Sequence, residues 1–168
     1  MLELLRELTE SGKSFADAGR EVAEMSVFTT HTPVEAGHDV FSEELVAEYF
    51  RHFWPALGLE QDQFMQLGRS PGESGWNMTA LALKLSGRRN GVSRRHGLVS
   101  RKMWNKLWPT VPEEQVPITS VTNGVHLATW VQQDLSWTYE KHLGQDWWDR
   151  QDDEALWSKA AAIPDEEL

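Results

Sequence analysis

Residues 25–33 read Met-Ser-Val-Phe-Thr-Thr-His-Thr-Pro, and this stretch decides the fold class. Residues 25–30 are mostly β-branched or aromatic, which is typical of a strand, and Thr32-Pro33 ends it. Ahead of this strand, Ser14 is placed to cap a helix whose apolar residues recur at helical spacing. Behind it, Ser42 opens another helix with two glutamates in its first turn, where the helix dipole favours anions. A strand between two helices predicts an α/β protein.

The rest of the chain adds helices and few strands. Further helices are predicted over residues 60–67, 78–86 and 93–107, and Trp-rich helices beyond Trp130. One more strand is visible over residues 118–122, so the expected sheet is too small for a complete doubly wound domain. The predicted apolar helix faces are Leu45, Val46, Tyr49, Phe50 and Phe53; Met78, Leu81, Ala82 and Leu85; and Val92, His96, Val99 and Met103.

Composition excludes several classes of protein. The 168 residues are 40% hydrophobic and include no Cys, so a disulfide framework and a thiolate metal site are excluded. No apolar run approaches the roughly 18–20 residues that cross a bilayer, and the N-terminus lacks a signal-peptide pattern, which together predict a cytoplasmic protein and no membrane partner. The net charge of -10 argues against a nucleic-acid partner.

Positive charge is concentrated in one part of this acidic chain. Between Lys84 and Lys106 there is no Asp or Glu, while half of the 16 Lys and Arg residues fall there. Such a cluster can bind anions, phosphate included, or it can form a solvated helix face that pairs with acidic neighbours. The second interpretation is favoured, and both stay open. The basic cluster consists of Lys84, Arg88, Arg89, Arg94, Arg95, Arg101, Lys102 and Lys106.

His31 and Asn90 are the candidate site residues. His31 lies just past the carboxyl end of a predicted strand, where open α/β sheets bind ligands, and an imidazole there can donate, accept or shuttle a proton. Asn90 lies in an Asn-Gly pair that predicts a turn; its amide either serves the backbone or offers a donor and an acceptor to a sugar hydroxyl. His96 reads as a core histidine, and His38-Asp39 is too sparse to predict a metal site. The sequence has nine Trp residues, and core packing or contact with an absent domain, rather than stacking on sugars, is the favoured role of Trp137, Trp147, Trp148 and Trp157.

Four segments in series resemble the bacterial and archaeal α-glucan phosphorylases. They read FTTHTPVEAGHD at residues 28–39, NMTALALK at 77–84, NGVSRRH at 90–96 and TSVTNGVHLATW at 119–130. Their order and rough spacing agree with that family, and the resemblance weakens beyond Trp130. Each motif alone is unspecific, whereas the series of four is specific.

The resemblance implies a function and a helix-rich α/β fragment of a two-domain, Rossmann-like (GT-B) glycosyltransferase fold. Residues 1–129 would be the later part of the first domain and residues 130–168 a helical crossing toward an absent C-terminal domain. The family cleaves the terminal α-1,4 bond of a glucan with inorganic phosphate and releases glucose 1-phosphate, using pyridoxal phosphate. His31 matches its active-site histidine, and Asn90 matches an asparagine that bonds the transferred sugar.

Some features of the family have no counterpart here. Nothing resembles the glycine-rich stretch around its pyridoxal lysine, nor its basic phosphate-binding motif. We therefore expect a fragment that is inactive alone and binds no cofactor covalently. Three alternatives remain: a related glucan synthase or other sugar transferase of the same architecture, a non-catalytic carbohydrate-binding module, and a plain helical interaction protein.

Overall fold

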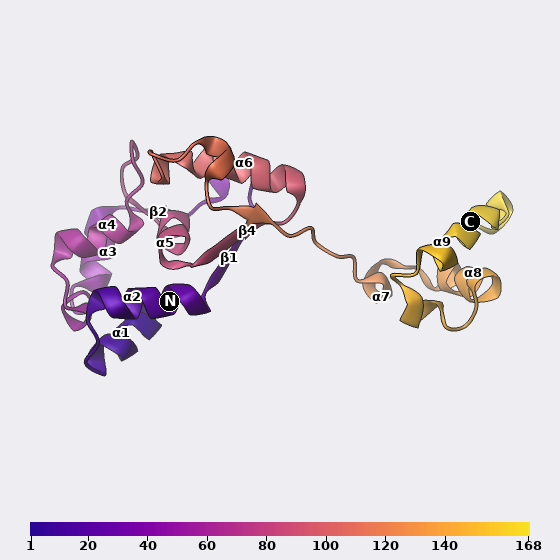
Figure 1. Cartoon of the computed structure of the whole chain (residues 1–168), viewed down its shortest axis with the longest axis horizontal. Helices are drawn as coiled ribbons and strands as arrows, with labels where there is room; N and C mark the ends of the chain where they lie inside the picture. The colour runs from indigo at the N-terminus through magenta and orange to yellow at the C-terminus, as the bar shows by residue number, and fades with distance from the viewer. The chain divides into compact units, whose positions relative to one another are not determined.

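The chain divides into two compact units, Met1–Asn123 and Gly124–Leu168 (Figure 1). The computed structural model describes residues 1–168, apart from the side chain of Glu35. Helices predominate and the strands are short, as the sequence predicts. Within the described part of the chain, no helix is long and apolar enough to cross a membrane.

A small parallel sheet forms the centre of the larger unit. Its strands lie in the order β1-β4-β5, and both neighbouring pairs are parallel. Parallel pairing brings the carboxyl ends of all three strands to one edge of the sheet. The strands are β1 (Val27–Thr30), β4 (Arg88–Gly91) and β5 (Thr119–Ser120).

The prediction of a turn at Asn90-Gly91 is wrong, because these two residues end the central strand β4. Asn90 pairs with Thr29 on one side and with Thr119 on the other. Pairing on both sides outweighs the local turn preference of an Asn-Gly pair. Residues 118–122 were predicted as a strand, and only Thr119–Ser120 enter the ladder.

A second, two-stranded ladder went unpredicted. β2 (Val40–Phe41) pairs antiparallel with β3 (Trp76–Asn77). Two-residue strands leave too little alternation in a sequence to be recognised.

Local capping signals place the helices of the larger unit well. Ser14 accepts a hydrogen bond from the Asp17 amide at 3.1 Å, and Ser42 accepts one from the Leu45 amide at 3.2 Å. The predicted helix starts there are confirmed. The helices are α1 (Leu2–Glu10), α2 (Phe15–Met25), α3 (Glu43–Phe50), α4 (Gln61–Gly68), α5 (Met78–Leu85) and α6 (Arg94–Trp104), with 3-10 turns at Glu35–Gly37, Pro55–Leu57, Asn105–Leu107 and Glu113–Gln115.

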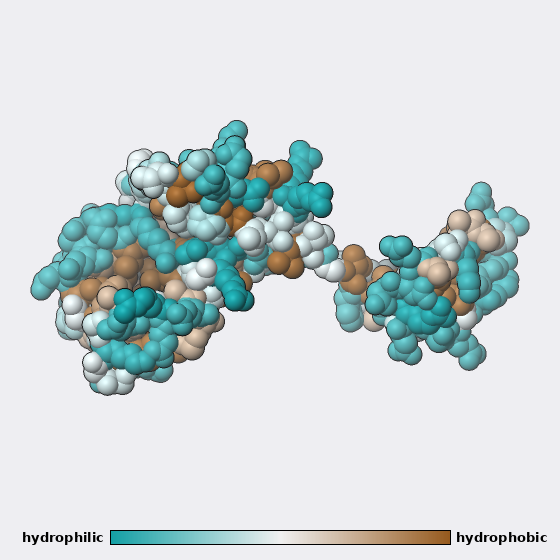
Figure 2. All heavy atoms as spheres, viewed as in Figure 1, coloured by the Kyte–Doolittle hydropathy of each residue, from teal (hydrophilic) through white to brown (hydrophobic). Residues whose placement is uncertain are grey.

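Two apolar clusters hold the larger unit together. One lies among helices α1 to α5, where the rings of Phe64 and Trp76 stack with centroids 5.6 Å apart. The other joins α5 and α6 to the sheet through Leu83, Trp104 and Ile118. In Figure 2 brown apolar residues show between the hydrophilic outer faces of these helices.

Three helix faces differ from the prediction. In α3 the row of Val46 and Phe50 faces the core, whereas the adjacent row of Leu45 and Tyr49 is exposed, Tyr49 by 75%. Met78, at the start of α5, is also exposed. In α6 the buried residues are His96, Gly97, Ser100 and Trp104, and Val99 is exposed. The prediction followed the most apolar row, but packing selects the row that faces the core.

The smaller unit is helical and rich in Trp, as predicted. Its core is formed by Leu143, Trp147 and Leu156, and Trp147 packs against Trp148 with centroids 4.0 Å apart. Trp137, expected to pack in the core or against an absent domain, is exposed and therefore lies outside the core. The elements are α7 (Leu127–Trp130), α8 (Gln133–Leu143) and α9 (Glu154–Ser158), with 3-10 turns at Trp147–Arg150, Lys159–Ala162 and Asp165–Glu167.

Candidate functional site

The parallel sheet brings the two candidate site residues to the same edge. Thr30, the last residue of β1, lies beside Gly91, the last residue of β4. His31 follows Thr30 directly and is exposed, while Asn90 precedes Gly91 and is only 8% exposed. This edge, at the carboxyl ends of parallel strands, is where open α/β sheets bind ligands.

The Asn90 amide is held in a fixed orientation. Its Oδ1 accepts a hydrogen bond from Thr29 Oγ1 at 3.0 Å, and its Nδ2 donates to the Gly91 carbonyl at 3.3 Å. An amide has two acceptor sites on oxygen and two hydrogens on nitrogen, so one of each remains for a ligand. Nothing in the sequence marked Thr29 as the partner of Asn90, because the two are 61 residues apart.

His31 lines a hollow of about 360 Å³ between its own loop and the first turn of α6. Val92 and Ser93, which directly follow β4, also line this hollow. The lining residues are His31, Pro33, Val92, Ser93, Arg95, His96 and Val99. None of these is acidic.

His96 is buried, as predicted, but one of its ring nitrogens lacks a partner. The Val92 amide donates to Nδ1 at 3.2 Å, and the His96 amide in turn donates to Ser93 Oγ at 3.1 Å. Nε2 is buried and has no hydrogen-bond partner among the described residues. His96 is therefore not the fully satisfied core histidine that the sequence predicts.

Two glycines let α6 approach the sheet closely. A Cβ on Gly91 would lie 2.9 Å from the Gly97 nitrogen, and a Cβ on Gly97 would lie 3.0 Å from the Thr119 carbonyl oxygen. Real Cβ atoms almost never make contacts below 3.0 Å, so residue 91 must be glycine for the first turn of α6 to sit over the carboxyl ends of the strands.

Half of the basic cluster serves the fold. Lys84 Nζ donates to the carbonyls of Gln66 and Arg69, and Arg101 donates to the Ile118 carbonyl at 2.9 Å. Lys106 pairs with Glu73.

Arg89 is the fourth of these structural cations: it donates to the Leu83 carbonyl and lies over the Trp108 ring. Burial lowers the pKa of Arg89 and that of Lys84. The remaining four members are exposed and form no ion pair with any described residue: Arg88, Arg94, Arg95 and Lys102.

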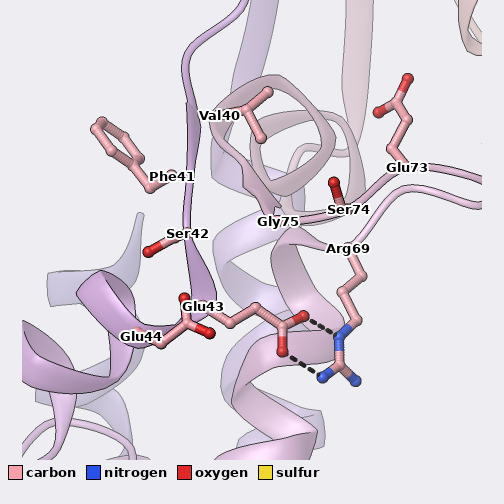
Figure 3. Close-up of a pocket in the computed structure, with 9 residues that line it drawn as sticks. All are labelled: Val40, Phe41, Ser42, Glu43, Glu44, Arg69, Glu73, Ser74 and Gly75. Atoms are coloured by element: carbon pink, nitrogen blue, oxygen red, sulfur yellow. Dashed lines mark hydrogen bonds and ion pairs between the residues drawn. The ribbon is translucent and has the colours of Figure 1, made fainter.

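A second hollow, of about 470 Å³, lies where the β2 strand meets the loop after α4 (Figure 3). Arg69 donates two hydrogen bonds to Glu43, at 2.6 and 2.8 Å, and a third to Asp62. Hydrogen bonds from Arg69 hold the pKa of Glu43 below its usual value. This hollow carries three glutamates, at positions 43, 44 and 73. The sequence marks Glu43 and Glu44 only as helix-start residues, so the hollow was missed.

The other histidines of interest take part in local contacts. His38 Nδ1 lies 2.8 Å from Thr79 Oγ1, and the His38 ring packs edge-on against Trp104 at 5.0 Å. In the smaller unit His126 Nδ1 lies 2.8 Å from Thr129 Oγ1. Among the residues whose side chains are described, no group of three or more His, Cys, Asp or Glu is placed to hold a metal ion.

Most of the lysines contact other protein groups. Four are engaged with protein groups: Lys13 with Glu21, Lys84 with two carbonyls, Lys106 with Glu73 and Lys141 with Glu167. Lys102 and Lys159 are exposed, and neither lines a hollow described above.

The chain is similar in sequence to several phosphorylases from bacteria and archaea. The chain is 39% identical to the maltodextrin phosphorylase of Thermococcus litoralis over 95% of its length, and 37% identical to the glycogen phosphorylase of Aquifex aeolicus over 96%. It is 44% identical to the glycogen phosphorylase of Mycobacterium tuberculosis over 77%. No protein-family model matches the chain.

These relatives are named as glycogen and maltodextrin phosphorylases. By sequence, the chain is homologous to a segment of the bacterial and archaeal glycogen and maltodextrin phosphorylases, as its four motifs indicate. It spans 16–23% of the length of those relatives.

Proposed function

We propose that this chain forms part of the active-site cleft of an α-1,4-glucan phosphorylase, with His31 and Asn90 against the glucosyl unit that is transferred. The observation that carries the proposal is their common position at the carboxyl edge of the β1-β4-β5 sheet, in a chain similar to phosphorylases over most of its length. The strands and helices of residues 1–129 would belong to the first of two facing Rossmann-like domains, and residues 130–168 would lead toward the second.

In the proposed reaction, inorganic phosphate replaces the glucan at C1 of the terminal glucose. The bond from C1 to the O4 of the next glucose breaks, a bond from C1 to a phosphate oxygen forms, and O4 leaves with the proton that hydrogen phosphate gives up. Asn90 would bind one sugar hydroxyl through its remaining acceptor and donor, and Thr29 fixes the direction of that amide. A polar group preset in this way can favour the transition state because it needs no reorganisation during the reaction.

Pyridoxal phosphate, which the family resemblance implies, would supply an acid–base phosphate group when bound. No lysine of this chain fits as its anchor, so we assign the cofactor to the C-terminal domain of the longer enzyme and route no step through it. The chain's own contribution is to bind and orient the sugar. A carbohydrate-binding module is less well supported, because Trp76, Trp104 and Trp147 are buried, and the exposed Trp130 and Trp137 line neither of the hollows described above.

Substitution of Asn90 in an active phosphorylase carrying this segment tests the proposal. Asn90→Ala should lower kcat/KM for glucan by about tenfold, the loss of one or two hydrogen bonds from the transition state. Asn105→Ala is the matched control, because the Asn105 amide donates to the Val111 carbonyl at 2.9 Å, at the other end of α6 from the sheet edge. Equal kinetic losses in the two variants would show that Asn90 acts only through stability.

A further inference from the structure

The backbone just past strand β4 is hydrogen-bonded to a histidine side chain on the next helix. Val92 follows Gly91, the last residue of β4, and its amide donates to Nδ1 of His96 at 3.2 Å. His96 lies in the first turn of α6 and is only 8% exposed. Its own amide donates to Ser93 Oγ at 3.1 Å, so both the backbone and the ring of His96 are held. The ring therefore fixes the backbone that follows β4.

The carbonyl of Val92 holds the backbone just past the neighbouring strand. It accepts a hydrogen bond from the Asn123 amide at 3.1 Å, and the Gly91 carbonyl accepts one from the Val121 amide at 2.9 Å. These bonds continue the pairing of β4 with β5 past the end of both strands. Asn123 is also the last residue of the larger unit. Val92 thus connects the His96 ring to the point where the chain leaves the sheet.

Only one nitrogen of the His96 ring has a partner among the described residues. The Val92 amide can donate only to a nitrogen that carries a lone pair, so the proton of the neutral ring lies on Nε2. Nε2 is buried and unpartnered. An unpaired buried donor is costly, and an apolar side chain of similar size would pack without that cost. The acceptor at Nδ1, and not packing alone, therefore accounts for a histidine at this position.

We propose that His96 is a positioning residue for the carboxyl edge of the sheet. Through Val92 it holds together the backbone that follows β4, beside Asn90, and the backbone that follows β5, at Asn123. Small displacements of the groups that orient a substrate can cost much of the rate, so the fixed edge would matter to catalysis. The inference rests on the proposed function in taking this edge as the site, and it adds a residue that need not touch the sugar.

Hydrogen exchange of single amides in the 168-residue chain, followed by NMR, tests this role. His96→Leu removes the acceptor and keeps an apolar side chain, so the Val92 and Asn123 amides should exchange about tenfold faster, as expected for one lost hydrogen bond. The Val121 amide, which bonds the Gly91 carbonyl, should change less than about twofold. His96→Asn should restore the protection, because the side-chain oxygen of Asn can accept in place of Nδ1.

Three results of the exchange measurement would overturn the proposal. They are unchanged exchange at Asn123 in folded His96→Leu, acceleration at Val121 equal to that at Asn123, and no recovery in His96→Asn. The wild-type ring gives an independent measurement if His96→Leu fails to fold. Its ¹⁵N signals should show Nδ1 unprotonated and Nε2 protonated, with a scalar coupling between Nδ1 and the Val92 amide. A proton on Nδ1 would contradict the proposal.

Kinetics of an active phosphorylase carrying this segment separate the positioning role from the proposed function. His96→Leu should lower kcat/KM for glucan about tenfold, and His96→Asn should stay within about twofold of wild type. Wild-type kinetics in folded His96→Leu would overturn the positioning role. If His96→Leu leaves the Asn123 amide unchanged while Asn90→Ala lowers glucan turnover, this inference falls and the proposed function stands. If the amide responds and Asn90→Ala has no kinetic effect, the proposed function falls instead.

Discussion

The hydroxyl of Thr29 donates a 3.0 Å hydrogen bond to the amide oxygen of Asn90, across 61 residues of chain. The two residues lie side by side in neighbouring parallel strands. This bond joins the β1 strand to the candidate sugar-binding amide and fixes which way that amide points. The geometry of the site therefore depends on the pairing of β1 with β4.

Thr29→Val should release the Asn90 amide from this orientation, because Val keeps the β-branched shape but lacks the hydroxyl that donates to Asn90. The unpaired Asn90 oxygen should cost about 0.5–1.5 kcal/mol of unfolding free energy, measured by urea denaturation. In an active enzyme the same change should lower glucan turnover. Thr119→Val is the control, because its hydroxyl bonds the Arg89 carbonyl rather than Asn90. A fully active Thr29→Val enzyme would show that the bond does not position Asn90.

Two helical glycines should respond to alanine with opposite signs. Gly97→Ala places a Cβ 3.0 Å from the Thr119 carbonyl oxygen and 3.1 Å from Ser120 Cβ, so overpacking should cost about 1–3 kcal/mol. Gly19, in α2, has open space where its Cβ would be, and Gly19→Ala should stabilise by up to about 1 kcal/mol. Thermal unfolding of both variants measures this. A stable Gly97→Ala protein would contradict the close packing of α6 on the sheet.

The Glu43–Arg69 pair should make stability depend on pH in the acidic range. Hydrogen bonds from Arg69 lower the pKa of Glu43 from its usual 4.5. A lowered folded pKa means that the contribution is present above pH 4.5 and is lost as the pH falls through the folded value. Because both side chains are about one-third exposed, the effect should stay below about 1 kcal/mol.

Urea midpoints between pH 3 and 7 measure the contribution of this pair. Glu43→Gln should flatten the acidic limb of the profile, and Glu48→Gln, on the exposed side of the same helix, should leave it unchanged. Identical profiles for wild type and Glu43→Gln would remove the pair as a source of stability.

The sequence predicts best what local contacts determine. Ser14, Ser42 and Asn77 bond amides two or three residues away, so the starts of their helices are readable from short motifs. Strand β4 was missed because its partners lie far along the chain and its Asn-Gly ending favours a turn locally. For the same reason, the sequence does not reveal that Thr29 is the partner of Asn90.

The hollow beside α6 could likewise not be predicted from the sequence. His96 was assigned to an apolar row with Val99, but the helix turns that row partly outward. The sequence allows two interpretations of the basic cluster, whereas in the structure four of its members contact backbone carbonyls, a ring or a carboxylate. Only the three-dimensional structure shows that these four residues make such contacts, whereas Arg95 is exposed and forms no ion pair with any described residue.

Production of glucose 1-phosphate by a chimera tests the central claim most directly. The aligned stretch of the Thermococcus litoralis maltodextrin phosphorylase, 159 residues, is replaced by the matching residues of this chain. The folded chimera should release glucose 1-phosphate from maltodextrin only when phosphate is added, and His31→Ala or Asn90→Ala should lower the rate about tenfold or more. The 168-residue chain alone, given pyridoxal phosphate, should release none. A folded chimera without phosphate-dependent product, or site variants with unchanged rates, would contradict the account.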